Sequence, residues 1–318
     1  MRKSGKRTER SNSHQKTVSG NWRTQLGYYM MFAVPALWMF LMSYVPLTGI
    51  YLAFVDYKPA KGIFGSKFVG LKHFKDFFSG YDFVRVFRNT IAYNVGTMVI
   101  VGLFCGILFA VLLYEIKSRV ANKIFHTCML LPAFISWTVV SAALMVLLQT
   151  ENGMVNQALE ILGLPPVSWY RRQEYWPAII IFAKIYKMAG MSSIYFYSSL
   201  LSINTELFDA ANIDGANRIK QIWHISLPAM SKVFCITLIN SLGGILSGGI
   251  SPYYELTFNN GELYETTLVL GTYLYNGLAD GRYSFSTAVG VVQSLIGLVL
   301  VVVSNMIVKR IDPESALF

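Results

Sequence analysis

Two lysines, Lys184 and Lys187, are the only charged side chains inside the long apolar runs of this 318-residue chain. A charge at the centre of a membrane helix costs about 2.5–3.5 kcal/mol on insertion scales, so each lysine needs polar surroundings. Helical spacing places both on one side with Met188, Met191 and Tyr195. We expect Lys184 to extend towards the outer surface, and Lys187 to face a water-filled path or an interhelical hydrogen bond.

Patterns that indicate catalysis or metal binding are missing from the sequence. It contains no GxxxxGK[ST] phosphate loop, no HExxH and no Cys-x-x-Cys, and its four histidines are scattered without ligand spacing. We therefore expect a chain that is not an enzyme, holds no metal or cofactor and does not hydrolyse ATP by itself. None of the apolar runs has an Asp or Glu in its middle, which argues against a proton-coupled carrier.

The composition places the chain in a lipid bilayer. Hydrophobic residues make up 54% of it, charged residues only 14%, and the mean hydropathy is +0.45, whereas soluble domains carry about 25% charged residues. A helix needs roughly 20 apolar residues to cross the hydrocarbon core. We predict an all-α integral membrane protein with a tilt or a break near Pro46. Its six transmembrane helices lie at about 26–55, 90–114, 124–148, 176–200, 233–253 and 285–308.

The basic residues predict the orientation of these helices, because Lys and Arg beside a span stay on the cytoplasmic side. With the N-terminus inside, they collect in the tail 1–25, in the two connections on that side and in the tail 309–318. The external connections carry equal numbers of basic and acidic residues. Membrane topology therefore explains the net charge of +10, with both termini cytoplasmic, and no nucleic-acid partner is expected.

Two external segments are partly apolar but are not predicted to cross. The first is expected to be a short helix lying on the outer surface, because apolar residues recur at helical spacing while lysines take its other face. The second, 263–278, is short for a span, and we expect a re-entrant or interfacial helix there. The apolar residues of the first segment are Phe68, Leu71, Phe74, Phe77 and Phe78.

A cytoplasmic segment at 202–230 combines small residues with turn signals between the fourth and fifth spans. Asn204 is expected to cap a first short helix, and Asp214-Gly215 to supply the turn that follows it. A second helix is predicted from Ala216 to His224. Pro228 then interrupts regular hydrogen bonding before the next span. The pattern predicts a compact helix-turn-helix on the inner face.

This segment resembles the cytoplasmic signature of permease subunits in ATP-binding-cassette (ABC) importers, which is EAA, three residues, G, nine residues and I-x-L-P. The chain has Asp209-Ala210-Ala211, then Gly215, then Ile225-Ser226-Leu227-Pro228 at the same spacings, with Asp in place of Glu. Weaker motifs at 68–74 and 89–90 are similar to the sugar-importer branch. Those at 45–46 and 54–57 resemble oligosaccharide permeases of the LplB and MalF type.

The resemblance implies the type I ABC importer permease fold, with a coupling helix that contacts a separate ATPase. It also implies an ATPase dimer that carries ATP and Mg, a second permease, which we expect to be a different chain, an extracytoplasmic solute-binding protein and a bacterial inner membrane as the location. In this sequence the residues expected to couple to the ATPase are Phe208, Asp209, Ala210, Ala211, Asp214, Gly215, Ala216, Ile225, Leu227 and Pro228. Ile213 and Ile219 are further candidates for apolar contacts with it.

The resemblance also directs attention to a substrate path for an oligosaccharide. Polar or small residues recur on one side of the fifth span, which indicates either tight helix packing or a polar groove for sugar hydroxyls. An aromatic ring would stack on the apolar face of a sugar. The candidate path residues are Trp137, Lys187, Met191, Tyr195, Asn240, Gly244, Ser247, Ser251 and Tyr253.

Four other interpretations remain open from the sequence. The segment at 202–230 is also compatible with an amphipathic helix pair lying on lipid. A permease for another small polar solute would show the same signature. An autonomous secondary carrier would not need an ATPase, and a membrane-embedded transferase would need clustered carboxylates or histidines, which the sequence does not show.

Overall fold

The structure is a computed structural model that describes residues 22–246 and 249–311. Most of the basic N-terminal tail, the C-terminal tail from 312 and the candidate path residue Ser247 lie outside the described residues. The chain divides into two compact units, residues 1–50 and 51–318.

The first unit contains one long apolar helical run. Helix α1 (Trp22–Met39) continues as a π-helical segment, Phe40–Tyr44, and then as a 3-10 segment, Val45–Phe54, that reaches into the second unit. The run Leu26–Phe54 is long and apolar enough to cross a membrane. The hydrogen-bonding pattern changes at Phe40, a few residues before the expected position at Pro46.

Three further uninterrupted runs in the second unit can each cross a membrane. One is formed by α3 (Phe83–Gly96), a π-helical segment and α4 (Gly106–Glu115). The others are α8 (Trp176–Leu201) and α16 (Tyr283–Ile311). Gly190 lets α8 lie close to the backbone at Met129, because a Cβ at Gly190 would lie 2.0 Å from the Met129 carbonyl oxygen.

The runs expected at 124–148 and 233–253 are not straight helices. In the first, α5 (Arg119–Leu130) and α6 (Trp137–Leu147) meet at 93° across a 3-10 turn that contains Pro132. In the second, α12 (Ser231–Gly243) ends in the glycine pair 243–244 and is bent by 56° from the helices before it. The described residues therefore contain four candidate spans, or up to six if each bent pair is one span.

The all-α expectation needs one correction, because a two-stranded antiparallel sheet follows the first run. Strand β1 (Val55–Lys58) pairs with β2 (Gly62–Phe68), and Val55 lies opposite Phe68. Phe68 is therefore in a strand, and the expected surface helix is only α2 (Lys72–Phe78). Gly70, with a positive φ of 60°, separates this strand from α2.

Short helices fill the remaining connections. Phe77 of α2 is buried against α16 instead of facing the surface. The segment expected to be re-entrant or interfacial is broken into α14 (Tyr264–Thr267) and α15 (Leu270–Ala279), and its central residues 267–270 are buried in protein. The other short helices are α7 (Met154–Ile161) and α13 (Tyr253–Thr257), with 3-10 turns at Pro59–Lys61, Trp169–Arg171, Gln173–Tyr175 and Gly261–Leu263.

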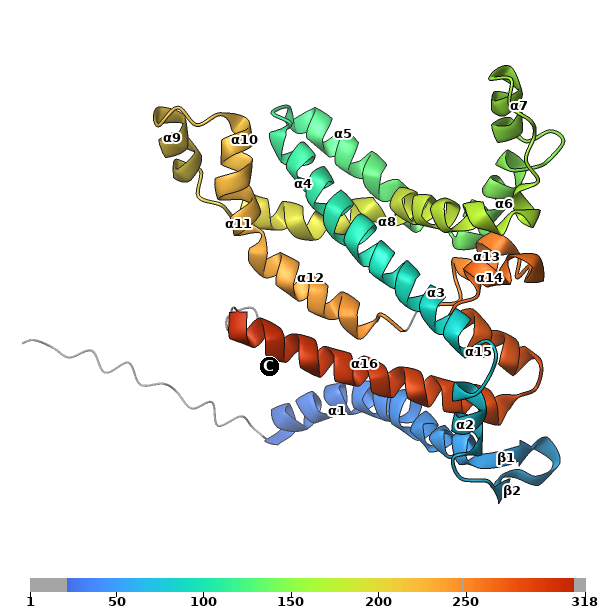
Figure 1. Cartoon of the computed structure of the whole chain (residues 1–318). Helices are drawn as coiled ribbons and strands as arrows, with labels where there is room; N and C mark the ends of the chain where they lie inside the picture. The colour runs from blue at the N-terminus through green and yellow to red at the C-terminus, as the bar shows by residue number, and fades with distance from the viewer. Residues whose placement is uncertain (1–21, 247–248, 312–318) are drawn as a thin grey trace, which may run out of the picture. The chain divides into compact units, whose positions relative to one another are not determined.

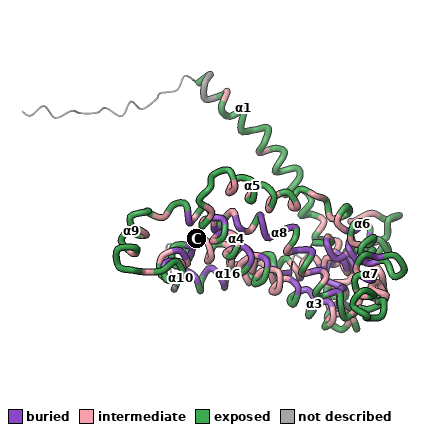
Figure 2. Tube along the Cα trace, turned by 90° about the horizontal axis from the view of Figure 1, so that it is seen from above, coloured by how far each residue is buried: buried purple, intermediate pink, exposed green. Residues whose placement is uncertain are grey.

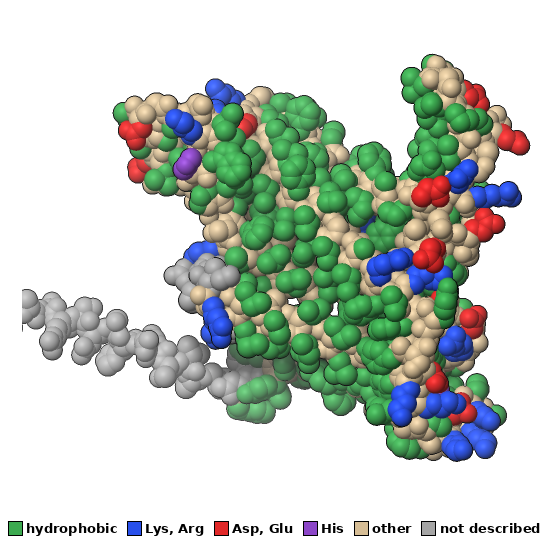
Figure 3. Space-filling view, viewed as in Figure 1, with side chains coloured by type: hydrophobic (Ala, Val, Ile, Leu, Met, Phe, Trp, Pro, Cys, Tyr) green, Lys and Arg blue, Asp and Glu red, His purple; other side chains and the backbone are tan. Residues whose placement is uncertain are grey.

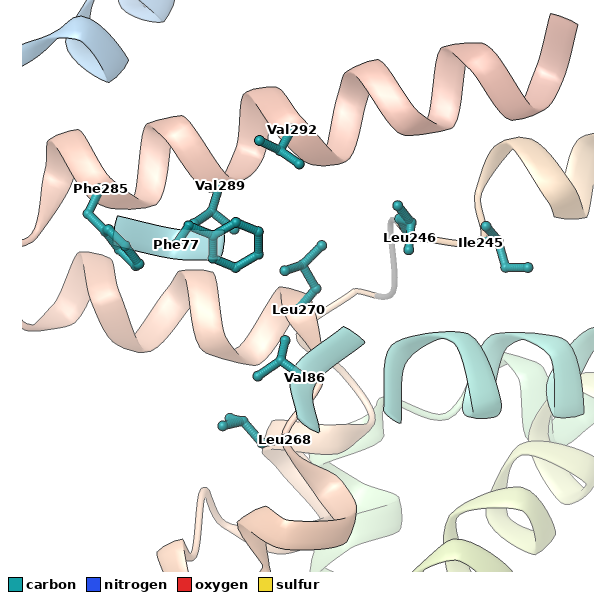
Figure 4. Close-up of a cluster of buried hydrophobic side chains, with 9 residues drawn as sticks. All are labelled: Phe77, Val86, Ile245, Leu246, Leu268, Leu270, Phe285, Val289 and Val292. Atoms are coloured by element: carbon teal, nitrogen blue, oxygen red, sulfur yellow. The ribbon is translucent and has the colours of Figure 1, made fainter. Parts of the chain in front are cut away.

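A cluster of apolar side chains joins α2, α3, α15 and α16 (Figure 4). Phe77, Val86, Leu270 and Val289 are all at most 2% exposed and lie at its centre. In the space-filling view of the second unit, charged side chains gather near α9 and α10 at one end and near α7 and the β-hairpin at the other (Figure 3). The largely apolar surface between them is what a lipid-facing band requires.

Candidate functional site

The segment 202–230, expected to be cytoplasmic, contains helix α9 (Glu206–Ile213) where the sequence predicted its first short helix (Figure 1). The side-chain oxygen of Asn204 accepts a hydrogen bond of 3.1 Å from the backbone N–H of Glu206, and its amide donates to the Glu206 carboxylate at 3.0 Å. Asn204 therefore satisfies one backbone donor at the start of α9, as expected, although the N-cap position itself is Thr205. Glu206 and Asp209 lie in the first turn, where the helix dipole favours negative charge.

Gly215 ends α9 in a Schellman motif. Its φ of 73° is in the left-handed region, which glycine adopts without a steric penalty. The N–H of Gly215 donates to the Asn212 carbonyl at 3.1 Å, and the N–H of Ala216 donates to the Ala211 carbonyl at 2.9 Å. These are the two hydrogen bonds of the Schellman motif, which satisfy carbonyl groups at the C-terminus of a helix. The glycine of the signature therefore has a conformational role.

The second helix of the segment is displaced from its expected range, Ala216 to His224. It starts as α10 (Arg218–Gln221), capped by the Asn217 side chain, which accepts from the N–H of Lys220 at 2.9 Å. It then continues through a π-helical stretch, Ile222–Ser226, into α11 (Leu227–Ala229). The bend towards α12 comes after Ala229. The wider π turn accommodates Pro228, which cannot donate a backbone hydrogen bond.

Buried Gln221 ties the two short helices together. Its amide donates to the side-chain oxygen of Asn212 at 2.7 Å and to the Ala216 carbonyl at 3.1 Å. Arg218 donates to the Gln221 side-chain oxygen at 3.1 Å and lies 3.7 Å from the carboxylate of Glu115 at the end of α4. No sequence pattern predicted the roles of Gln221 and Arg218, because one buried amide in a polar loop has no distinguishing pattern.

The outer face of α9 is open to solvent (Figure 2). Asp209, Ala210 and Asp214 are exposed, and the Ile213 side chain is 87% exposed. Phe208 differs from its neighbours, because its ring lies 5.9 Å from that of Tyr114 in the same chain. Phe208 therefore anchors α9 on α4. Of the other expected coupling residues, two are exposed, Gly215 and Pro228. The remaining four are half-buried: Ala211, Ala216, Ile225 and Leu227.

Lys184 does not extend towards the outer surface, so that expectation was wrong. Its side chain is buried, and its Nζ donates to the hydroxyl oxygens of Thr97 at 2.9 Å and Tyr253 at 2.6 Å. Hydroxyl groups from two other elements replace water around the ammonium group. The sequence identified Tyr253 only as a ring for stacking and gave no reason to choose Thr97.

Lys187 makes the interhelical hydrogen bonds that were one of its two expected environments. Its Nζ donates to the carbonyl oxygen of Ala133 at 2.9 Å and also to that of Ile135, both in the break between α5 and α6. Its ammonium group lies 5.4 Å from the centre of the Trp137 ring. The buried charge thus satisfies carbonyl groups that the bent helix leaves without helical partners.

Two of the expected path residues, Tyr195 and Asn240, line a groove of about 420 Å³ between α8 and α12. Met191 is 41% exposed on the same side of α8. The path residues after Asn240 were expected to continue along one side of a helical fifth span. That expectation was wrong, because α12 ends at Gly243. Gly244 caps that helix, and Ser251 lies in the following turn. Within the described residues, no group of three potential metal ligands is found.

Comparison with known proteins identifies the family of this chain. The family model described as "Binding-protein-dependent transport system inner membrane component" matches residues 102–316. The chain is 34% identical to the polygalacturonan/rhamnogalacturonan transport system permease protein YteP of Bacillus subtilis, covering 90% of this chain and 89% of that protein. It is 32% identical to Protein LplB of the same organism, covering 90% of each.

A solved structure has the same fold. It is a crystal structure of a bacterial ABC transporter involved in the import of the acidic polysaccharide alginate, and one of its chains is 31% identical with a TM-score of 0.82. The match covers 92% of this chain and 97% of that one. The chain therefore belongs to the family of binding-protein-dependent transport system inner membrane components, which are multi-pass proteins of the bacterial plasma membrane.

Proposed function

We propose that this chain is one of two permease subunits of an ATP-driven importer and that its cargo is an oligosaccharide. It crosses the membrane six times with both termini in the cytoplasm. An ATPase dimer, which holds the ATP and Mg, binds α9. The second permease is a different chain, and a solute-binding protein delivers the cargo from outside.

The geometry of α9 carries this proposal. An exposed helix with small residues can lie in a groove on a partner, and the Schellman closure and the buried Gln221 make it rigid. Contacts of Phe208 with Tyr114 and of Arg218 with Glu115 connect it to α4. A push on α9 would therefore move the spans as a rigid body, which is what ATP-driven alternation of a pathway requires.

The cargo class is supported by the relatives. The name of YteP gives polygalacturonan and rhamnogalacturonan, and a second crystal structure similar to this chain contains an alginate pentasaccharide bound to a periplasmic protein. The groove beside Tyr195 and Asn240 offers a ring face and an amide to such a chain. A fragment of polygalacturonan, trigalacturonate, is therefore the probe of choice.

Substitution of Ile213 tests the role of α9. The complex, with its ATPase, second permease and binding protein, is reconstituted in proteoliposomes, and ATP-dependent uptake of trigalacturonate is measured. Ile213→Ser should lower uptake and copurification of the ATPase about tenfold, because an exposed apolar anchor is lost. The matched control is Ile161→Ser on α7, since Ile161 is also 87% exposed but lies outside the cytoplasmic segment.

Two results would contradict the proposal. One is that Ile213→Ser leaves both uptake and copurification as in the unsubstituted complex. The other is that the chain alone accumulates trigalacturonate in vesicles without ATP, which would identify an autonomous carrier.

A further inference from the structure

A polar cavity of about 430 Å³ lies in the part of the second unit opposite α9. It is formed by α3, the segment 254–282 and the start of α16. Its volume is within the range of small-molecule sites, about 300–1,000 Å³. Leu268 and Phe285 line it and also belong to the apolar cluster of Figure 4, so the cavity rests on a packed base. None of its lining residues has a part in the coupling segment or the α8–α12 groove.

One wall of the cavity is aromatic. Tyr254 and Tyr275 lie edge to face with ring centres 5.2 Å apart, which holds both rings in place. Tyr275 is 39% exposed although it belongs to a packed helix. A rigid, accessible ring presents a flat apolar face, and the C–H groups on one face of a pyranose ring are the complementary surface.

Another wall presents amide groups. The side chains of Asn259 and Asn276 hydrogen-bond to each other at 3.1 and 3.2 Å, and the Tyr264 hydroxyl joins both at 2.8 and 2.9 Å. Asn259 has a φ of 52°, and Phe258 before it a φ of 51°, both in the left-handed region. Such a conformation is uncommon outside glycine and is retained where it aims a side chain at a site.

The charges around the cavity are balanced. Arg85 is paired with Asp82 and with Glu265, while Arg282 stacks 4.1 Å over the Phe285 ring. The buried Nε of Arg85 has no hydrogen-bond partner among the described residues. These groups can bond to the hydroxyl groups of a sugar, and Arg282, which forms no ion pair among the described residues, can face the carboxylate of an acidic sugar unit.

A neighbouring cavity of about 320 Å³ extends the site. Arg282 and Phe285 line both cavities, and the second also contains Tyr57, His73 and Tyr283. Rings and polar groups, including the carboxylates of Asp56 and Asp76, thus continue beyond the first cavity.

We propose that these two cavities bind successive sugar units of an oligosaccharide on the outer face, before it enters the membrane path. Tyr254 and Tyr275 stack on one ring, and Asn259 and Asn276 bond to its hydroxyl groups. The assignment to the outer face rests on the proposed function and its orientation.

Equilibrium binding of trigalacturonate tests this site. The complex of the two permeases and the ATPase, without ATP and without the binding protein, is placed in nanodiscs, and binding is followed by saturation-transfer NMR. Tyr275→Ala should weaken binding about three- to tenfold, and Tyr275→Phe, which keeps the ring, less than about twofold. Asn259→Gly keeps the left-handed backbone but removes the amide, and should weaken binding about fivefold.

The control is Tyr175→Ala. Tyr175 is 41% exposed and lies edge to face with Trp169 at 5.2 Å, the same arrangement as Tyr275 with Tyr254, but it lies outside both cavities. The Tyr175→Ala complex should bind trigalacturonate as tightly as the unsubstituted complex does. In nanodiscs that hold the two permeases without the ATPase, Ile213→Ser should leave trigalacturonate binding unchanged, so a failure of ATPase coupling and a failure of this site are measured separately.

Three outcomes would overturn the proposal. The first is that the unsubstituted complex does not bind trigalacturonate. The second is that Tyr275→Ala binds it as tightly as the unsubstituted complex does. The third, measured after the binding protein is added to the same nanodiscs, is that Tyr275→Ala weakens only the association of the binding protein, which would make the cavity a protein contact and not a saccharide site.

Discussion

The ammonium group of Lys184 donates a hydrogen bond of 2.6 Å to the hydroxyl oxygen of Tyr253, and it lies 4.6 Å from the centre of the same ring. Thr97 accepts a second hydrogen bond from it at 2.9 Å. Three elements, α8, α13 and the π-helical segment Thr97–Cys105, are thus joined at one buried charge. Because no other charged group forms an ion pair with Lys184 among the described residues, these hydroxyl groups carry its solvation.

Loss of the Tyr253 hydroxyl should therefore destabilise the chain. Tyr253→Phe keeps the ring but removes one acceptor from a buried charged donor, and we expect a loss of about 1–3 kcal/mol in the free energy of unfolding. In a Lys184→Met background the same substitution should cost less than about 0.5 kcal/mol, because the donor is gone. Reversible unfolding in mixed micelles gives both differences, and equal costs in the two backgrounds would contradict the pairing.

Lys187 should be required for the bend between α5 and α6. Lys187→Met leaves the Ala133 and Ile135 carbonyls without a charged donor, and we expect a loss of about 1.5–3 kcal/mol in unfolding free energy. Amide hydrogen exchange around residues 133–139 should also become faster. Met188→Ala, next to it but 41% exposed, is the control and should leave that exchange unchanged. Unaltered exchange in Lys187→Met would show that the bend does not need the lysine.

Gly215 should not tolerate a side chain. Gly215→Ala forces an L-residue into the left-handed region, at a cost of about 1–2 kcal/mol. The Schellman closure would weaken, and ATPase copurification should fall with it. Gly261→Ala is the matched control, because a Cβ added at Gly261 would also meet no atom within 4 Å, but Gly261 does not have a positive φ. Equal effects of the two substitutions would exclude a conformational role for Gly215.

Glu265 should make stability depend on acid pH. Hydrogen bonds from Arg85 and then Arg88 hold the pKa of its carboxyl group below the ordinary value of 4.5. A carboxyl group with a lowered folded pKa stabilises the protein above its unfolded pKa and loses this contribution as the pH falls through the folded value. At pH 7 the melting temperature of the unsubstituted chain should therefore be higher than that of Glu265→Gln. The two melting temperatures should converge below pH 4.5.

Nearby Glu262→Gln serves as the control for this pH series, since Glu262 forms no ion pair among the described residues. Its melting temperature should follow that of the unsubstituted chain at every pH. A Glu265→Gln difference that stays constant from pH 7 to acid would show that the two arginines do not stabilise the charged carboxylate.

The sequence by itself determined the membrane class, the two short helices within 202–230 and the family. Apolar composition and span length need no tertiary information, and neither does the spacing of Asp209, Gly215 and Pro228. Short-range geometry also followed from local residues, because a capping amide at Asn204 and a left-handed glycine act within a few residues of chain.

Only the tertiary structure decided which groups the buried charges contact. Lys184 reaches Thr97 and Tyr253, which are 87 and 69 residues away, and no local pattern marks them. The end of α12 at Gly243, the bend at Pro132 and the strand at Phe68 also depend on competing conformations of nearly equal local cost. Packing against distant elements selects among such conformations, and a single sequence does not state which elements will be neighbours.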